Sequence, residues 1–67
     1  MKQVGTVREF SISKGWGFIE AESGRKVFFH HSNILMGYRP LSAGDPVEFS
    51  MGRDGSGRLQ AVNVRPF

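Results

Sequence analysis

Aromatic side chains at alternate positions are the feature of this sequence best suited to chemistry with a ligand. Trp16 and Phe18 lie in the stretch Lys-Gly-Trp-Gly-Phe-Ile, and Phe28 and His30 lie in the stretch Val-Phe-Phe-His-His-Ser. Alternate side chains of a β-strand share a face, so each pair presents two rings on one side of its strand. Packing gives a protein no reason to expose rings in a row beside lysines and arginines, whereas unpaired bases stack on such rings. The spacing therefore predicts a stacking surface for single-stranded nucleic acid.

The histidines and the serine beside them raise the question of a metal site or a catalytic site. Consecutive residues of a regular strand point to opposite faces, so His30 and His31 are not expected to chelate one ion. The chain has no cysteine, and no carboxylate stands at a spacing that would complete a metal site. Ser32 lacks an identifiable acid to orient a base and an identifiable oxyanion hole. We therefore expect no catalytic residue, no metal, no cofactor and no small-molecule substrate, and we do not expect an enzyme.

The charge of the chain favours a polyanionic partner. Nine Lys and Arg residues stand against six Asp and Glu residues, which gives a net charge of +3 and a pI of about 10.0. This excess is too small to identify the partner by itself. Its placement is more informative, because four cations lie close in sequence to the aromatic residues: Arg8, Lys14, Lys26 and Arg39. Three further arginines are interpreted as solvated turn or strand-edge residues that can also contact the phosphates of a bound strand: Arg25, Arg53 and Arg58.

Length and composition indicate a small cytoplasmic protein. Sixty-seven residues allow one domain, which we place over residues 1–67. The absence of cysteine fits a reducing cytoplasm and leaves the core without disulfides. No apolar run approaches the ~20 residues of a membrane-spanning helix, and the N-terminal residues lack the hydrophobic segment of a signal peptide. We expect a monomer with no membrane partner.

Short alternating apolar runs separated by glycine-rich segments indicate an all-β protein. The pattern predicts strands over residues 3–10, 16–21, 26–31, 46–51 and 58–64. Turns are predicted at residues 22–25 and 52–57, and a long irregular connection is predicted at residues 36–45. Residues 32–35 are expected to form a single helical turn with Ser32 as its cap. Five short strands in a chain of this size predict a five-stranded antiparallel barrel of the OB type.

The same alternation predicts which side chains fill the barrel. Inward positions are expected at Val7, Gly15, Gly17, Ile19, Val27, Phe29, Val47, Phe49 and Met51. A small barrel has room for few large rings, so Phe18 and Phe28 are left on the outer face. Glycine at inward positions permits the bending and close approach that a tightly closed barrel requires.

The two aromatic stretches resemble the motifs of a known family, the cold-shock domain. Residues 14–19 are similar to its first RNA-binding motif, with Trp16 where the family usually has Phe. Residues 27–31, Val-Phe-Phe-His-His, resemble its second motif, commonly Val-Phe-Val-His-Phe, and residues 60–64 resemble its last strand. The RRM fold shares part of the first motif, but it requires an aromatic where this chain has Ala21 and carries its second motif upstream of the first. The order of the motifs over essentially the whole chain favours the cold-shock domain.

The resemblance implies which side chains contact nucleic acid. The implied base-stacking residues are Trp16, Phe18, Phe28, His30 and Tyr38, and the implied cations beside them are Arg8 and Lys14. Phe10 matches an aromatic that is partly buried in the family, and Arg39 lies next to Tyr38 on the long connection.

Two positions depart from the family's pattern. Glu9 stands where many members have a stacking Trp, and His31 replaces a stacking Phe. A carboxylate cannot stack and repels phosphate, so its presence removes about 1–3 kcal/mol at that subsite. His31 can still stack, because imidazole is flat. We therefore expect weaker binding or a shorter footprint than is usual in the family.

These observations lead to the hypothesis of a binder of single-stranded RNA or DNA with little sequence specificity. A base stacked on Trp16 or Phe28 is unavailable for pairing, so binding opposes weak secondary structure without ATP. The resemblance implies an RNA chaperone and, by analogy, a regulator of transcription or translation in the cold. The sequence leaves the preference between RNA and DNA open, because stacking uses a face common to both.

The alternative hypothesis is a small β-barrel that binds a protein partner through the same aromatic patch. Protein interfaces also favour aromatic residues and arginine. Salt separates the two hypotheses, because oligonucleotide binding weakens steeply as salt rises and an apolar protein interface responds much less.

Overall fold

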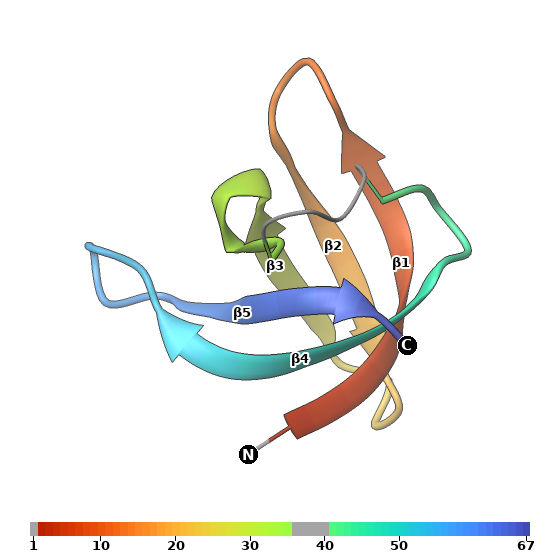
Figure 1. Ribbon diagram of the computed structural model, residues 1–67. Helices are drawn as coiled ribbons and strands as arrows, with labels where there is room; N and C mark the ends of the chain where they lie inside the picture. Colours follow the sequence, from red (N-terminus) through yellow and green to blue (C-terminus); the bar gives the residue numbers. More distant parts are fainter. Residues whose placement is uncertain (1, 36–40) are drawn as a thin grey trace.

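The computed structural model describes residues 2–35 and 41–67, which form one antiparallel sheet. Its elements in chain order are β1 (Lys2–Ser11), β2 (Trp16–Ala21), β3 (Lys26–His30), the 3₁₀ turn η1 (His31–Asn33), β4 (Pro46–Arg53) and β5 (Leu59–Pro66). The strands are hydrogen-bonded in the order β3-β2-β1-β4-β5 (Figure 1). The expected all-β, five-stranded antiparallel OB fold is therefore confirmed.

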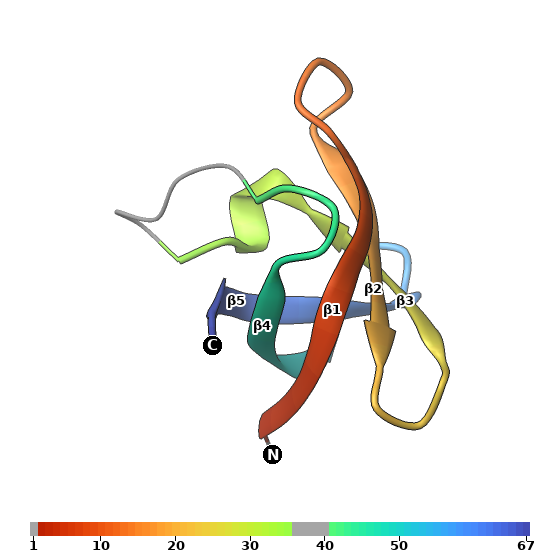
Figure 2. The same cartoon turned by 90° about the vertical axis from the view of Figure 1, so that its right-hand side faces the viewer.

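The sheet curls so that its two ends meet. Figure 2 shows β5 passing behind β1 and β2 at a steep angle, and β3 and β5, the first and last strands of the sheet, contact each other. A short parallel bridge between Ile34 and Val64 joins the segment after η1 to β5. The Leu35 N–H also donates to the Val64 carbonyl at 2.8 Å. These contacts close the barrel.

The core lies inside this barrel and consists of the inward side chains of all five strands. Its largest fully buried side chains are Val7, Ile19, Phe29, Val47, Phe49 and Val64. Val27 is also buried, whereas Met51 is only partly buried and packs against the edge of the core. The inward positions expected from alternation are thus confirmed, with Met51 at the margin. Ala21, Leu41 and Ala61 complete the core, although the sequence pattern did not single them out.

Strands β1 and β2 approach each other unusually closely at Gly17. A Cβ atom added there would overlap the Glu9 carbonyl oxygen, so only glycine fits this inward position. The pairing of β1 with β2 shifts register between Val7 and Glu9, which makes Arg8 the extra residue of a β-bulge. Both Arg8 and Glu9 are exposed.

Several predicted boundaries were wrong, two of them because a contact between strands or loops outweighs a local signal and one because of a local side-chain hydrogen bond. Residue 31 leaves the third strand, since the His31 N–H donates to the Gly15 carbonyl at 2.8 Å. The cap of the following turn is His30, whose Nδ1 accepts from the Ser32 N–H, and not Ser32 itself. β4 continues through Gly52 to Arg53, because these residues pair with the start of β5 at Leu59. The predicted turn at 52–57 is therefore shorter, and Arg58 precedes β5.

Candidate nucleic-acid interface

The four predicted rings lie together on the outer face of β2 and β3. Antiparallel pairing sets Trp16 opposite His30 and Phe18 opposite Phe28, and directly paired residues share a face. The centroid of the Trp16 ring lies 5.7 Å from that of Phe18 and 5.9 Å from that of Phe28, and the Phe18 and Phe28 centroids are 6.1 Å apart. All four side chains are half-buried. We call Trp16, Phe18, Phe28 and His30 the aromatic platform.

These rings lie on the outer face because other side chains already occupy the interior of the barrel. Ile19, Val27 and Phe29 alternate with the platform residues and are buried at 0–3% exposure, which leaves no inward position for a further ring. Phe10 is partly buried and stacks on Phe29 with centroids 5.4 Å apart and ring planes 12° apart. The partial burial expected for Phe10 is confirmed, and its ring supports the core rather than extending the platform.

The histidine pair adopts a geometry that the strand pattern did not predict. Because β3 ends at His30, the rings of His30 and His31 lie side by side, with centroids 4.4 Å apart. The expectation that they face opposite ways was therefore wrong. Across the residues that the structure describes, no group of three side chains that could hold a metal ion occurs.

Hydrogen bonds orient the His30 ring, and the His31 ring packs against Gly15. The Ser32 N–H donates to His30 Nδ1 at 3.2 Å, and the Ser32 hydroxyl lies 2.9 Å from the same nitrogen. In neutral His30 the ring proton therefore lies on Nε2. The His31 ring covers Gly15, where an added Cβ would lie 2.7 Å from His31 Cδ2. His31 thus extends the platform beyond the end of β3 and holds the β1–β2 loop.

Two lysines border the platform. Lys14 Nζ lies 5.9 Å from the centroid of the Trp16 ring, and Lys26 Nζ lies 5.3 Å from that of Phe18. Both distances are within the range of a cation–π contact. These two ammonium groups place positive charge at the border of the aromatic platform.

Arg8 is at the β1 edge of the platform, but its charge is compensated within the chain. Its Nε donates to Glu20 Oε1 at 2.6 Å. Glu9 is exposed beside this pair and is set opposite Phe18 by the pairing of β1 with β2. Strand alternation alone did not indicate the ion pair, because the bulge at Arg8 changes which residue of β1 faces β2.

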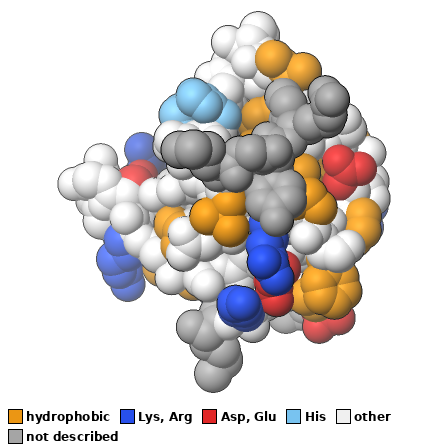
Figure 3. Space-filling model, viewed as in Figure 1, with side chains coloured by type: hydrophobic (Ala, Val, Ile, Leu, Met, Phe, Trp, Pro, Cys, Tyr) orange, Lys and Arg blue, Asp and Glu red, His pale blue; other side chains and the backbone are white. Residues whose placement is uncertain are grey.

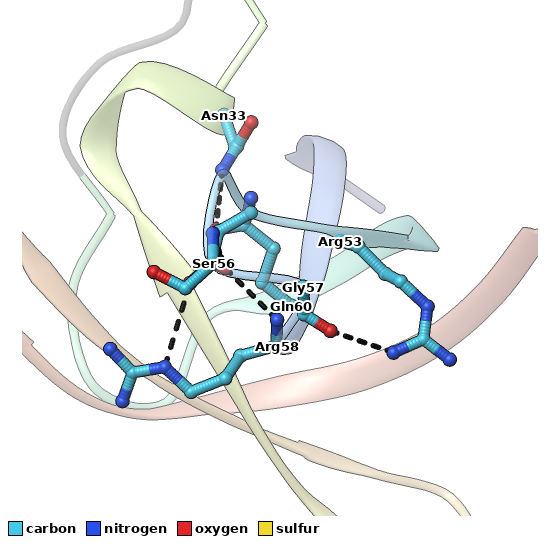
Figure 4. Close-up of polar contacts among 7 residues, drawn as sticks. Asn33, Arg53, Ser56, Gly57, Arg58 and Gln60 are labelled. Atoms are coloured by element: carbon cyan, nitrogen blue, oxygen red, sulfur yellow. Dashed lines mark hydrogen bonds and ion pairs between the residues drawn. The ribbon is translucent and has the colours of Figure 1, made fainter.

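The β4–β5 hairpin approaches the other side of the platform, where Phe28 borders two hollows. One, of about 320 Å³, is lined by Phe18, Phe28, Asp54, Arg58 and Leu59. The other, of about 450 Å³, continues past Phe28 and His30 to Arg53, Asn33 and Gln60. Gln60 is buried, and its Oε1 accepts from the Asn33 amide at 3.1 Å (Figure 4). The sequence pattern singled out Arg53 and Arg58 but not the two hollows, which depend on how the barrel closes.

Backbone hydrogen bonds order the tip of this hairpin. The Asp54 Oδ1 accepts from the N–H groups of Ser56 and Arg58 at 2.8 and 2.9 Å. The hydrogen bond from the Arg58 backbone is the main reason why the pKa of the Asp54 carboxyl is lowered. Figure 4 shows the Arg53 guanidinium turned back to the Gly57 carbonyl, to which it donates at 2.7 Å.

Tyr38 and Arg39, the remaining predicted contact residues, lie outside the described residues. None of the described segments forms a helix long and apolar enough to cross a membrane.

A five-stranded antiparallel barrel that carries rings and lysines on one outer face defines the class of OB-fold oligonucleotide binders. A family model for the 'Cold-shock' DNA-binding domain matches residues 3–67. The chain belongs to the cold-shock domain family, whose members are non-enzymatic proteins that bind single-stranded nucleic acids.

Two relatives of similar length are bacterial proteins. Cold shock-like protein CspA of Stigmatella aurantiaca is 51% identical over 63 residues, which cover 91% of both chains. Cold shock protein CspA of Staphylococcus aureus is 48% identical over 65 residues, or 96% of both chains.

Longer proteins contain the same domain. Cold shock protein 1 of Arabidopsis thaliana is 43% identical over 65 residues, and this chain spans 22% of its length. The solved structure of drosophila Unr CSD456 matches 100% of this chain and 27% of that one, with a TM-score of 0.80 and 29% identity.

Proposed function

We propose that this protein binds single-stranded RNA or DNA by stacking successive bases on the aromatic platform. The observation that carries the proposal is the cluster of half-buried rings on the outer face of β2 and β3, bordered by Lys14 and Lys26. Stacking on such rings tolerates any base, since every base has a π-face. The protein accordingly shows little sequence specificity.

The proposed biological role is that of an RNA chaperone. A base on the platform is withdrawn from intramolecular pairing, and modest affinity lets the protein release the strand again. Weak secondary structure is thereby melted without ATP. Such an activity supports transcription or translation in the cold, the setting for which the bacterial relatives are named.

Quenching of Trp16 fluorescence by oligonucleotides tests the proposal. Trp16 is the only tryptophan and lies within the platform, so stacking on it should quench its emission. Titration with oligothymidine and oligouridine at low and moderate salt should give saturable quenching that weakens as salt rises. Phe28→Ala should reduce affinity by about 5- to 150-fold, the equivalent of the about 1–3 kcal/mol that a stacked base contributes.

Thermal unfolding of Phe28→Ala is the control, because the variant must remain folded for its loss of binding to count. No quenching of the wild type by either oligonucleotide at micromolar protein would contradict the proposal. In that case the aromatic platform would be tested as a protein-binding surface. The same salt series would identify such a surface, because an apolar protein interface responds little to salt.

A further inference from the structure

We propose that His31 contacts a phosphate of the bound strand as an imidazolium ion, so that binding of the strand takes up a proton. This inference rests on the proposed function and gives His31 a role that stacking alone does not require. Phenylalanine, the residue that His31 replaces, carries no charge and could make no such contact. The affinity of this chain for a polyanion should therefore depend on pH.

The His31 ring is open to an anion at the end of the aromatic platform. The residue is exposed, and the Cδ2 edge of its ring packs against Gly15, so that Nδ1 lies on the opposite edge. Among the residues that the structure describes, no hydrogen bond involves a nitrogen of this ring. Figure 3 shows imidazole atoms (pale blue) at the molecular surface, near the position of η1 in Figure 1. A protonated His31 can thus donate an N–H from this surface to a phosphate.

His30 is the less suitable of the two rings to take up the proton. Its Nδ1 accepts from the Ser32 N–H at 3.2 Å, and this contact caps η1. An imidazolium ion has a proton on both ring nitrogens and cannot accept a hydrogen bond. Protonation of His30 would set one N–H against another and uncap the turn. Protonation of His31 breaks no hydrogen bond among the described residues.

The two rings are too close to carry a charge together without repulsion. Their centroids lie 4.4 Å apart, and a positive charge on one ring opposes a second on the other. Histidine is the side chain that ordinarily changes its charge between about pH 5 and 8. We therefore expect the pair to take up no more than one proton in this range.

The charged side chains around the pair leave room for an added anion. Lys14 precedes Gly15, on which the His31 ring packs, and residues 10–15 and 27–35 contain no carboxylate. The hollow of about 450 Å³ that His30 lines also has one cation and one anion of the β4–β5 hairpin: Arg53 and Asp54. The charged residues of β2 and β3 pair at the far end of these strands: Glu20 and Lys26.

A bound phosphate supplies the anion that this end of the platform lacks. An anion beside an imidazole favours its charged form. The strand therefore binds the form with protonated His31 more tightly than the form with neutral His31. Because coupling between two ligands is reciprocal, a lower pH must in turn strengthen binding of the strand.

The affinity for oligouridine at two pH values tests the proposal. Anisotropy of an oligouridine with a pH-insensitive label is measured at several salt concentrations, at about pH 5.5 and about pH 7.5. Uracil gains no proton in this range, and the carboxylates of the protein stay charged because their reference pKa values are about 4. At about 0.1 M salt the wild type should bind about fivefold more tightly at the lower pH, with a slope of log K against log salt steeper by about 0.7, the equivalent of one added phosphate contact.

Two histidine variants locate the proton. His31→Phe keeps a ring that can stack but cannot be charged, so its affinity and salt slope should be the same at both pH values. His30→Asn keeps a carbonyl oxygen that can accept from the Ser32 N–H. It should bind more weakly than the wild type at both pH values, because the platform loses a ring, and should still show the fivefold gain. Thermal unfolding at both pH values shows whether the variants are folded.

Proton uptake by the wild type gives a second readout that needs no variant. Calorimetric titration with oligouridine at about pH 6.5, in two buffers of different ionisation enthalpy, counts the protons taken up on binding. Absence of uptake would overturn the proposal, as would a fivefold gain that persists in His31→Phe or disappears only in His30→Asn. In each case the wild type still binds oligouridine, so the proposed function stands. A wild type that binds oligouridine at neither pH contradicts the proposed function itself.

Discussion

Glu9 shows how one residue can set the reach of the aromatic platform. It is exposed and stands directly opposite Phe18 in the β1–β2 pairing, so its side chain lies on the platform's face. A ring at this position would extend the stacking surface onto β1, whereas the carboxylate ends it. The residue therefore limits the proposed footprint on one side.

Replacing this carboxylate with a ring should strengthen binding. We expect Glu9→Trp to raise affinity for oligouridine about 5- to 150-fold, because each stacked base contributes about 1–3 kcal/mol. Anisotropy of a labelled oligonucleotide measures this without interference from the second tryptophan. Glu9→Gln separates removal of the charge from addition of the ring, and equal affinities for the two variants would show that no base stacks at position 9.

At the scale of elements, the β1–β2 loop is held to the end of β3 through Gly15. This glycine has a φ of +82°, its carbonyl accepts from the His31 N–H, and the His31 ring occupies the space of a Cβ atom. Two separate constraints therefore require glycine here: the left-handed backbone and the imidazole against it.

Gly15→Ala should destabilise the protein more than Gly24→Ala does. Gly24 has a similar φ of +89°, but nothing lies within 4 Å of the place that its Cβ atom would take, so its substitution reports the backbone cost alone, about 1–2 kcal/mol. Urea unfolding of both variants gives the difference, which measures the contact with His31. Equal losses of unfolding free energy would mean that His31 moves aside at no cost.

The strands were predictable where alternation dominates and less so where tertiary contacts decide. The bounds predicted for the second strand, residues 16–21, agree with β2, because aromatic and glycine residues alternate there without ambiguity. The end of β3 and the extension of β4 depend on His31 meeting Gly15 and on Gly52 pairing with β5, neither of which is local. The candidate site was likewise predictable only in part. Strand alternation predicts that the rings of the aromatic platform share one face. The Arg8–Glu20 ion pair depends on the bulge in β1, and the hollows beside Phe28 depend on closure of the barrel, so neither could be predicted from alternation.

At the scale of the whole molecule, the stability of the fold depends on one small core of buried side chains. A domain of this size buries a modest share of its surface, so each large core side chain carries a substantial part of its stability. Phe29 and Phe28 are neighbours in β3, yet the first is fully buried and the second is half-buried on the outer face.

These two phenylalanines should therefore respond to truncation to very different degrees. Phe29→Ala should lower the free energy of unfolding by about 3–5 kcal/mol, because it empties the core and removes the ring on which Phe10 stacks. Phe28→Ala should lower it far less. Urea unfolding of the two variants makes the comparison, and losses of similar size would contradict the division between inner and outer faces.

The alternation of faces along β2 and β3 also has an evolutionary consequence. Under the proposed function, substitutions at Trp16, Phe18 or Phe28 change the stacking surface, while the buried Ile19, Val27 and Phe29 keep the core filled. Selection can thus revise ligand preference at one outward position at a time without endangering foldability. Glu9 and Trp16 both stand outside the buried core, at positions where such a change leaves the packing of the barrel untouched.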